Sequence, residues 1–351
     1  MSKIIKKVLV LLLSSAFIAS TLGGCGSGEG KSSAQGKTYK LGVSAYPAFY
    51  TWYICQEEDF FKKNNVSVEL VNFPVYSDSV QAFATGQLDM LSLATPDTIA
   101  PYINGIKLES VLVLDNSNGA DGLVANSSVN SIADLKGKSV ATEYGTIEHF
   151  FLLNVLKTAG LKESDINLVN LSISDSAPAF LSDKVEAACL WEPSLSQALA
   201  KKDSKLLTSS KDTPGLIPDV LVAGGDMLEN GKQDIINVIN AYYDAMDFYV
   251  ANKDKAIKDM SKGAQISEDE MKVAMSGSKL FTIQEGIDTM DNKAENYSYL
   301  PHTILKISEF LKDVKLIDKL PDDSAKLVNS YYLKEVLKGR KSNPVPDTSM
   351  N

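Results

Sequence analysis

Short apolar runs alternate with amphipathic stretches along the chain from residue 38 onward. Apolar runs rich in β-branched residues predict buried strands, and stretches with apolar residues three and four positions apart predict helices. The predicted elements are, in order, a strand over 40–45, a helix over 51–63, a strand over 66–73, a helix over 77–85, and strands over 88–94 and 108–115. This alternation is typical of a parallel α/β architecture.

A second α/β unit starts at Ile132, after a polar stretch over 116–121. A short helix, a glycine break and a new strand over 139–141 follow one another there. The later elements are a helix over 151–159, strands over 166–171, 187–191 and 219–223, and helices over 233–252 and 298–312. The pattern therefore predicts two α/β units followed by a mostly helical segment.

The first residues have the pattern of an export signal rather than of a folded element. Three lysines precede an uncharged, mostly apolar run over 8–22, which predicts a signal peptide over residues 1–24. The run ends in Leu22-Gly23-Gly24-Cys25, which resembles the lipobox of bacterial lipoproteins, in which the cysteine is acylated. Residues 25–37 then form the lipidated cysteine and a flexible tether. We expect a body anchored to the cell membrane on its extracytoplasmic face.

Composition excludes several function classes. The 351 residues carry a net charge of −9, so nothing draws the chain to nucleic acid, which requires clustered lysine and arginine. The two histidines and three cysteines provide little material for a metal site or a disulfide framework. The segments Gly30-Lys31-Ser32 and Gly137-Lys138-Ser139 lack the first glycine of a phosphate-binding loop, and no Gly-x-Ser-x-Gly elbow occurs. We expect no cofactor and no catalysis.

Candidate ligand contacts lie in turns that follow predicted strands, where parallel α/β proteins bind small molecules. Tyr46 and Trp52 follow the first strand as an aromatic wall, although Trp52 could equally pack in the core. Thr95 is placed to contact a ligand or simply to cap a helix. The turn after the strand at 139–141 is the strongest candidate for a polar or anionic group. Its candidate residues are Glu143, Tyr144, Thr146 and His149, of which His149 could instead be an ordinary helix-surface residue.

Four carboxylates also fall at predicted strand ends: Asp115, Glu143, Glu192 and Asp219. Together they would repel a bare anion unless they pair with lysines or meet a cation, and interlobe salt bridges are the alternative role for each. Glu192 is the residue we most readily assign to a ligand amino or amidine group, with Trp191 beside it as an apolar or cation–π face. Arg340 is the only arginine, so a guanidinium clamp on an anion is not available in the predicted cleft.

Several motifs together carry a resemblance to a known family. They are the lipobox, Asp134-Leu135-Lys136-Gly137-Lys138, the turn Thr142-Glu143-Tyr144-Gly145-Thr146, and Leu190-Trp191-Glu192-Pro193. From about Thr38 to Glu229 the chain resembles substrate-binding proteins of ABC importers, in the nitrate, sulfonate and taurine branch that also contains thiamine-pyrimidine binders.

The resemblance implies a two-lobe periplasmic-binding-protein-like fold of type II, with a ligand cleft that closes by hinge motion. Lobe 1 would comprise residues 38–131, lobe 2 residues 132–218, and the return to lobe 1 with the C-terminal helices residues 219–341, followed by a frayed tail over 342–351. The implied partners are a small-molecule ligand and the permease and ATPase subunits of an importer, and the receptor is expected to be a monomer.

The ligand class stays open between two candidates. A sulfonate, nitrate or taurine would be held by helix N–H groups and hydroxyls. A thiamine-precursor pyrimidine or another amine-bearing heterocycle would use the aromatic residues and the acids. A remote alternative is an enzyme that resembles the fungal thiamine-pyrimidine synthase, but the export signal and the absence of a cysteine-rich cluster argue against it.

The lipobox makes a direct prediction about maturation. Globomycin inhibits the peptidase that cleaves lipoprotein precursors, so treated cells are expected to accumulate the uncleaved chain, as seen by immunoblot. A Cys25→Ala variant should accumulate the same precursor without the drug. Mature protein that appears at the normal rate in treated cells would contradict the lipobox assignment.

Overall fold

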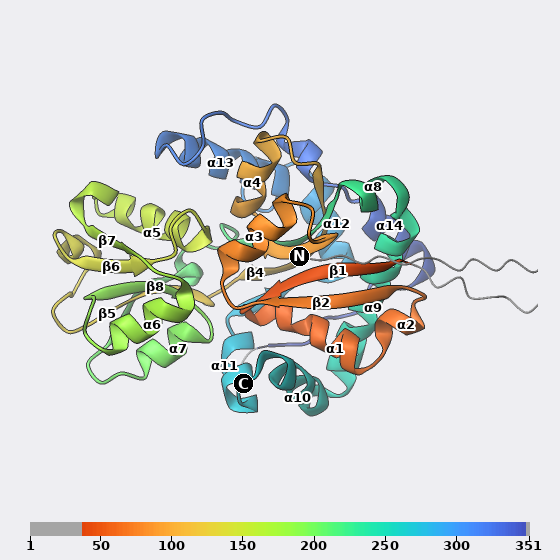
Figure 1. Ribbon diagram of the computed structural model, residues 1–351, viewed down its shortest axis with the longest axis horizontal. Coiled ribbons are helices and arrows are strands. Elements are labelled where there is room, and N and C mark those ends of the chain that lie inside the picture. The colour runs from red at the N-terminus through yellow and green to blue at the C-terminus, as the bar shows by residue number, and fades with distance from the viewer. Residues whose placement is uncertain (1–36, 349–351) are drawn as a thin grey trace, which may run out of the picture. The chain divides into compact units, whose positions relative to one another are not determined.

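Two β-sheets organise residues 37–348, the part of the chain that the computed structural model describes (Figure 1). The predicted signal peptide over 1–24, Cys25 and all of the tether except Lys37 lie outside the described residues. Both sheets are mixed and both carry helices, which confirms the α/β class.

The first sheet has six strands in the order β11-β4-β10-β3-β1-β2. The strands are β1 Thr38–Ser44, β2 Ser67–Phe73, β3 Met90–Ala94, β4 Leu108–Ser117, β10 Pro218–Gly224 and β11 Ser278–Leu280. β1 runs parallel to β2 and β3, as the alternating pattern predicts. β10 runs antiparallel to both β3 and β4, and β11 runs antiparallel to β4, so a purely parallel arrangement was wrong for this part. β10 is the strand with which the chain re-enters this sheet after the second sheet.

The second sheet has five strands in the order β7-β6-β8-β5-β9. They are β5 Asp121–Ala125, β6 Ser139–Thr142, β7 Asn167–Asn170, β8 Ala187–Trp191 and β9 Lys205–Ser209. β6 is parallel to β7 and β8, whereas β5 is antiparallel to β8 and β9. We expected residues up to 131 to belong with the first lobe, but β5 pairs in the second sheet. The polar stretch over 116–121 leads directly into β5, so the pattern predicted no strand there, although all five residues of β5 are buried.

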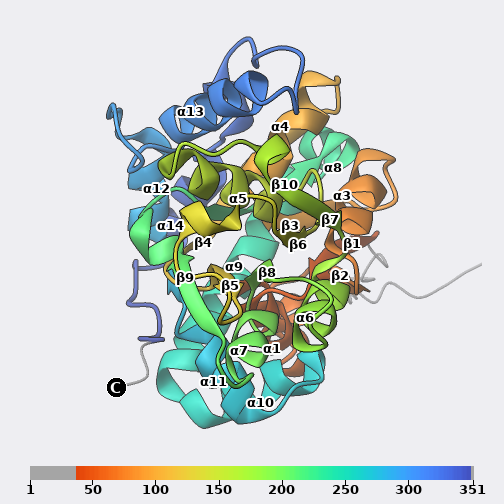
Figure 2. The same cartoon turned by 90° about the vertical axis from the view of Figure 1, so that its left-hand side faces the viewer.

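Helices cover both sheets, and three of them, α5, α6 and α7, pack against the strands of the second sheet (Figure 2). The helices before the second sheet are α1 Thr51–Glu57, α2 Phe60–Lys63, α3 Tyr76–Ala84 and α4 Pro96–Ile103. Those of the second sheet are α5 Ile147–Thr158, α6 Ile173–Leu181 and α7 Ser194–Leu199. The C-terminal helices are α8 Gly225–Asn230, α9 Lys232–Ala251, α10 Lys253–Ala264, α11 Glu268–Met275, α12 Ile283–Asp291, α13 Leu300–Asp313 and α14 Tyr331–Gly339. None of the helices in the described range has the length and apolar character needed to span a membrane.

The predicted helix over 51–63 is broken into α1 and α2. Asp59 takes a left-handed conformation with φ of 55° between the two helices. Aspartate is one of the few residues that tolerate this region, because its short polar side chain can bond locally. The break changes the direction of the chain before β2.

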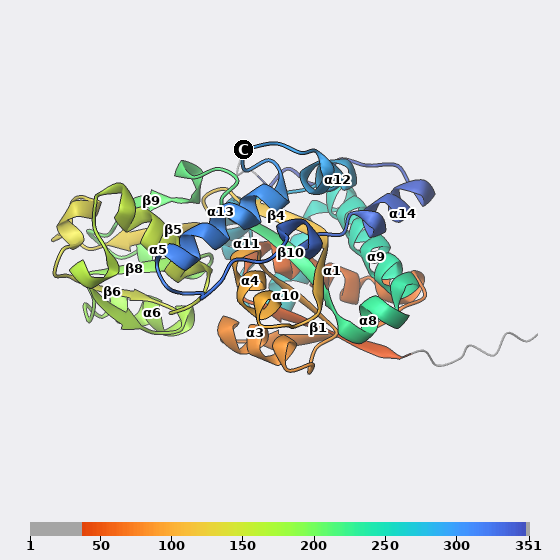
Figure 3. The same cartoon turned by 90° about the horizontal axis from the view of Figure 1, so that it is seen from above.

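Helix α13 reaches from the first sheet's helices to the second (Figure 3). It packs against α4, and Phe310 on α13 makes an edge contact with Phe150 on α5, with 5.4 Å between ring centroids. Lys157 on α5 lies 3.8 Å from Asp313 at the end of α13. A C-terminal helix therefore contacts the unit that the sequence places in the middle of the chain.

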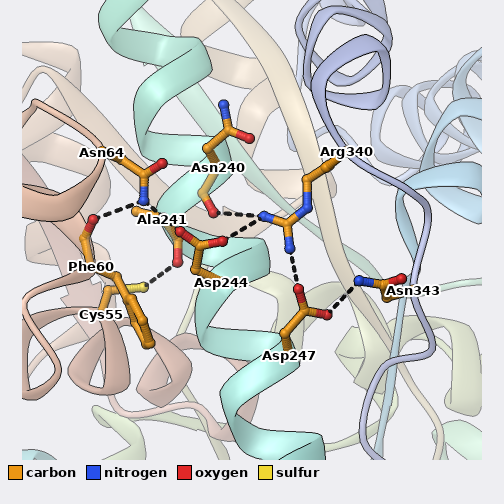
Figure 4. A network of polar contacts seen from close by, with 9 residues as sticks. All are labelled: Cys55, Phe60, Asn64, Asn240, Ala241, Asp244, Asp247, Arg340 and Asn343. Carbon is orange, nitrogen blue, oxygen red and sulfur yellow. Dashed lines mark hydrogen bonds and ion pairs between the residues drawn. The ribbon is translucent and has the colours of Figure 1, made fainter.

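The single arginine holds the C-terminal segment against α9 (Figure 4). Arg340 donates from Nη1 to the carbonyl of Asn240 at 3.2 Å and to Asp244 at 2.9 Å, and from Nη2 to Asp247. Asn343 donates to the other oxygen of Asp247 at 3.0 Å. The tail predicted to fray from residue 342 is thus held at its start.

Its later residues are also attached, since the hydroxyl of Thr348 donates to the carbonyl of Ser278 at 2.7 Å. The prediction of a frayed tail was wrong as far as residue 348. Residues 349–351 lie outside the described part.

Replacing Arg340 should weaken this attachment. In an Arg340→Leu variant, Asp244 and Asp247 lose their cation, and we expect the free energy of unfolding to fall by about 1–2 kcal/mol, discounted for the partial exposure of both acids. An Arg340→Lys variant keeps the positive charge but cannot contact both aspartates as a guanidinium does. Its free energy of unfolding should lie between those of the parent and the leucine variant. Urea denaturation measures the effect, and a leucine variant as stable as the parent would contradict it.

Candidate functional site

A small cavity lies where the two sheets face each other. Its lining residues come from both sheets and the turns that follow their strands: Tyr46, Phe49, Tyr76, Ala94, Asp121, Ile147, Trp191, Ile217 and Asp219. Its volume is about 10 Å³, which is room for about one water molecule. Any larger solute therefore requires the two walls to separate before it can enter.

Strand direction brings the lining residues together. Ala94 ends β3 and Trp191 ends β8, so both lie at carboxyl ends of strands. Asp219 pairs with Ala94, and Asp121 pairs with Trp191, because β10 and β5 run antiparallel to these strands. The two reversed strands thus contribute aspartates from their first two residues to the edge where α/β proteins bind ligands.

Aromatic rings form much of the cavity wall. Tyr76 and Trp191 meet edge to face with 5.2 Å between ring centroids, and Tyr46 lies 4.9 Å from Phe49. The hydroxyl of Tyr76 donates to Asp97 at 2.7 Å and accepts from the backbone N–H of Ala94 at 3.0 Å. Tyr76 is therefore fixed by the first sheet while its ring contacts a residue of the second.

Two buried aspartates of the first sheet, Asp115 and Asp219, lie directly opposite each other on β4 and β10. The hydroxyl of Tyr46 donates to Asp115 at 3.3 Å, whereas Asp115 Oδ1 and Asp219 Oδ2 accept from no N–H or hydroxyl group. When the pair holds a proton, the two carboxyls hydrogen-bond to each other. Burial raises the pKa of Asp115 to about 7. Burial, together with the charge of Asp115, raises the pKa of Asp219 well above its ordinary value. At neutral pH the pair therefore retains a proton.

The second sheet adds further buried acids. Burial raises the pKa of Asp121 to about 6, even though it accepts a hydrogen bond from the Ser117 hydroxyl. Glu148, on α5, is fully buried and neither of its oxygens has a hydrogen-bond partner. Burial, followed by the charge of Asp121, raises the pKa of Glu148 well above its usual range.

No cation balances these acids within residues 37–348. The ion pairs there involve none of the buried acids near the cavity, and no lysine or arginine lines it. Arg340 is committed to α9. In the described chain, no group of three or more histidine, cysteine, aspartate or glutamate side chains is arranged to hold a metal ion.

Carboxylates also bridge the two sheets through backbone N–H groups. Asp97, on α4, accepts from the N–H of Ile147 at the start of α5, at 3.2 Å. Glu143 accepts from Ser77 on α3 at 3.0 Å and from Ile173 on α6 at 3.4 Å. Burial raises the pKa of Asp97 to about 7, although its hydrogen bonds with Tyr76 and Ile147 act in the opposite direction. Asp97 therefore engages the first N–H of the helix N-terminus at which we expected an anion.

Two candidate ligand contacts, Trp52 and Thr95, do not line the cavity. Trp52 is fully buried, its indole N–H donates to Ser92 at 2.8 Å, and its ring packs near Tyr242. This is the core role that the sequence left open. Thr95 is also buried and its hydroxyl has no partner.

The turn at 143–146 is held together by its own residues. The hydroxyl of Thr146 donates to the carbonyl of Glu143 at 2.7 Å. His149 is buried, accepts from the N–H of Gly145 at 3.2 Å through Nδ1, and lies 3.0 Å from Glu163 through Nε2. Burial lowers the pKa of His149, against the opposing effect of Glu163, so the neutral ring donates from Nε2.

Tyr144 lies over this ring, with 4.4 Å between centroids, and is 48% exposed. Glu192 is buried but accepts twice from Ser196, from its N–H at 3.1 Å and its hydroxyl at 2.7 Å. It therefore braces the start of α7 and does not line the cavity.

Of the residues selected from the sequence, Tyr46, Trp191 and Asp219 line the cavity, and Asp115 and Glu143 contact residues around it. Sequence reasoning missed the lining residues Tyr76 and Asp121, and also Asp97 and Glu148. Asp97 lies just after Thr95 in the first turn of α4, where an acidic residue is ordinary. Asp121 was missed because the sequence pattern did not predict β5, the strand that it begins.

The comparisons with known proteins agree with this architecture. Residues 46–256 match the family model described as NMT1/THI5 like. The taurine-binding periplasmic protein of Escherichia coli is 24% identical over 79% of this chain and 87% of its own length. A putative aliphatic sulfonates-binding protein of Bacillus subtilis is 26% identical over 73% of this chain and 80% of its own length.

A solved structure has the same fold. The alkanesulfonate-binding protein of Xanthomonas axonopodis pv. citri, bound to MOPS, superposes with a TM-score of 0.70 at 17% identity. The match covers 84% of this chain and 99% of that protein. The periplasmic-binding-protein-like fold is thereby confirmed.

The buried acids predict an unusual dependence of stability on pH. Asp97, Asp115 and Asp121 have a higher pKa in the folded chain than in the unfolded chain, so the folded chain binds more protons. Folding is then disfavoured as the pH rises through about 4 to 7. We expect the free energy of unfolding to be larger at pH 5 than at pH 8, by up to about 1.4 kcal/mol per pH unit for each group.

His149 opposes this trend, because its lowered pKa favours folding as the pH rises, but it is one group against several. Urea denaturation at pH 5, 6, 7 and 8 measures the balance. A free energy of unfolding that is constant or increases from pH 5 to pH 8 would contradict ionisable, unpaired acids in the core.

Proposed function

Because the chain belongs to the NMT1/THI5-like family, we propose that it is the solute-binding lipoprotein of an ABC importer. In this role it captures one small solute between two lobes and delivers it to the permease and ATPase subunits. The lobes correspond broadly to the two sheets with their helices. The receptor acts as a monomer and binds its solute without transforming it.

The observation that carries the proposal is the cavity between the sheets. Both walls contribute aromatic and acidic side chains, and bonds from Asp97 and Glu143 join the walls directly. The chain passes between the sheets twice, after β4 and before β10. Two such crossings are suited to a hinge between the sheets. Because the cavity is small, a solute would enter an open form of the protein and be enclosed when the sheets approach each other.

The anchoring part of the proposal rests on the sequence. The apolar run over 8–22 and the motif ending in Cys25 support export and acylation. A lipid on Cys25 would keep the receptor on the extracytoplasmic face of the cell membrane, beside its permease. The tether would leave the two sheets free to open and close.

Binding without catalysis is supported by the placement of the histidine and by the relatives. Both ring nitrogens of His149 have partners close to its own turn, so it is not placed as a general base at the cavity. The relatives described above are named as binding proteins. The remote resemblance to a thiamine-pyrimidine synthase therefore has no support from the cavity.

Two ligand classes are favoured by different observations. The names of the relatives favour a sulfonate such as taurine, and nitrate is a candidate from the same family resemblance. The acids around the cavity, with no lysine or arginine beside them, favour an amine-bearing heterocycle such as a thiamine-precursor pyrimidine. The receptor role does not depend on which class is correct.

A capture experiment tests the receptor role without assuming the ligand. The mature chain with Cys25→Ser is incubated with concentrated growth medium, washed, and denatured, and the released small molecules are identified by mass spectrometry. We expect one small molecule to be retained, and small-angle scattering to show a smaller radius of gyration when it is bound.

A Trp191→Ala chain is the matched control, because this substitution removes one aromatic wall and should reduce retention at least tenfold. Circular dichroism checks that the substituted chain is folded. If the parent chain retains no more solute than the Trp191→Ala chain does, and its radius of gyration stays unchanged, the protein is not a solute receptor.

A further inference from the structure

Building on the proposed receptor function, we propose that the solute is a small organic cation, a protonated amine or amidine with N–H donors. Its positive group would be held by the carboxylates of Asp115, Asp219 and Asp121. Its body would lie against Tyr76 and Trp191. This deepens the receptor role by assigning both the chemical class of the solute and the residues that select it.

The first argument is that two buried aspartates have carboxyl oxygens that accept from no N–H or hydroxyl group. Asp219 lines the cavity, is 2% exposed, and has one oxygen that accepts from no N–H or hydroxyl group. Asp115, directly opposite on β4, is fully buried, and one of its oxygens has no partner other than the Asp219 carboxyl, a contact that depends on the proton the pair retains. Burying such groups without partners is costly, and an ionised carboxylate can only accept hydrogen bonds. A solute with several N–H donors would satisfy both aspartates at once.

The second argument is that the nearest backbone donors already have carboxylate partners. The N–H of Ile147, the backbone donor on the cavity wall, is engaged by Asp97, and the N–H of Ser77 is engaged by Glu143. No lysine or arginine lines the cavity. An incoming sulfonate or nitrate would instead meet Asp121 and the Asp115–Asp219 pair, which still carries one negative charge when it retains one proton. Like charges in a low-dielectric site repel strongly.

The third argument is the aromatic wall. The ring of Trp191 meets Tyr76 edge to face at the cavity, and Tyr46 and Phe49 add two further rings. Aromatic faces attract cations, most strongly when water is excluded. A metal ion would gain little from these rings, and the described residues show no cluster suited to coordinate one. The combination of rings and carboxylates therefore favours an organic cation.

The proton on the aspartate pair links binding to pH. The groups that face Asp115 and Asp219 are Asp121 of β5, Glu148 of α5 behind it, the Tyr46, Tyr76 and Tyr242 hydroxyls, and Ser278 of β11, and none of these carries a positive charge. A bound cation replaces the shared proton, so binding should release about one proton. Because the pKa of Asp219 is raised well above its ordinary value, affinity should increase as the pH rises from 6 to 8.

Matched probes that share a phenyl ring test the charge. Benzamidine and benzylamine are cations with N–H donors, benzyltrimethylammonium is a cation without them, and benzenesulfonate and benzoate are anions. Taurine and isethionate form a second pair, which differ by an ammonium in place of a hydroxyl. We expect only the N–H cations, with taurine above isethionate, to raise the melting temperature of the Cys25→Ser chain, and calorimetry in buffers of different ionisation enthalpy to show proton release.

Variants test the residues. Asp219→Asn and Asp115→Asn should each weaken binding of the N–H cations by at least tenfold and flatten the pH dependence. Both should fold, and melt at or above the parent temperature without ligand, because they remove a buried charge. Asp269→Asn, on the exposed start of α11, makes the same change in net charge and should bind like the parent.

The outcomes separate this inference from the receptor role. Benzenesulfonate or isethionate binding as well as the matched amine, Asp219→Asn binding like the parent, or no stabilisation by any N–H cation would each overturn the cation assignment. If the capture experiment still yields a retained solute, the receptor role stands. If it yields none, both proposals fail.

Discussion

Burial of carboxyl groups without nearby cations is the constraint on which this site depends. Asp115, Asp219, Asp121 and Glu148 are almost inaccessible to solvent, and each has a raised pKa because burial disfavours its charged form. Such buried carboxyl groups destabilise the folded state unless they keep their protons or accept hydrogen bonds. The raised pKa values favour the protonated carboxyls in the resting protein, and a solute with N–H groups would provide the donors.

Topology explains why these acids meet. Two of the strands that run against the parallel direction, β5 in one sheet and β10 in the other, carry an aspartate near their start, at the edge where neighbouring strands end. The same edge carries the bonds from Asp97 and Glu143 that join the two sheets. In the proposed receptor, one set of strand ends would provide both ligand contact and closure, and capture of a solute would be coupled to the approach of the two sheets.

The sequence predicted the α/β class, the restart into a second unit, and Asp115, Asp219, Tyr46 and Trp191 near the site, because strand ends are marked by the change from apolar to polar residues. The sequence could not distinguish residues that face a ligand from residues that hydrogen-bond within their own turn. Glu192 and His149 lie at suitable positions along the chain, but Glu192 is engaged by Ser196 and His149 by the N–H of Gly145. It also missed β5, whose polar flank resembled a loop. Pairing partners, which decide such cases, are set by tertiary contacts that no local pattern contains.

A crystal structure of the chain with the small molecule that it retains from growth medium would test the cation assignment most directly. We expect nitrogen atoms of the solute within hydrogen-bond distance of the carboxylates of Asp115 or Asp219, with the Asp97 bond to Ile147 still in place. A sulfonate or nitrate bound at the N-terminus of α5, with Asp97 displaced from it, would contradict the assignment.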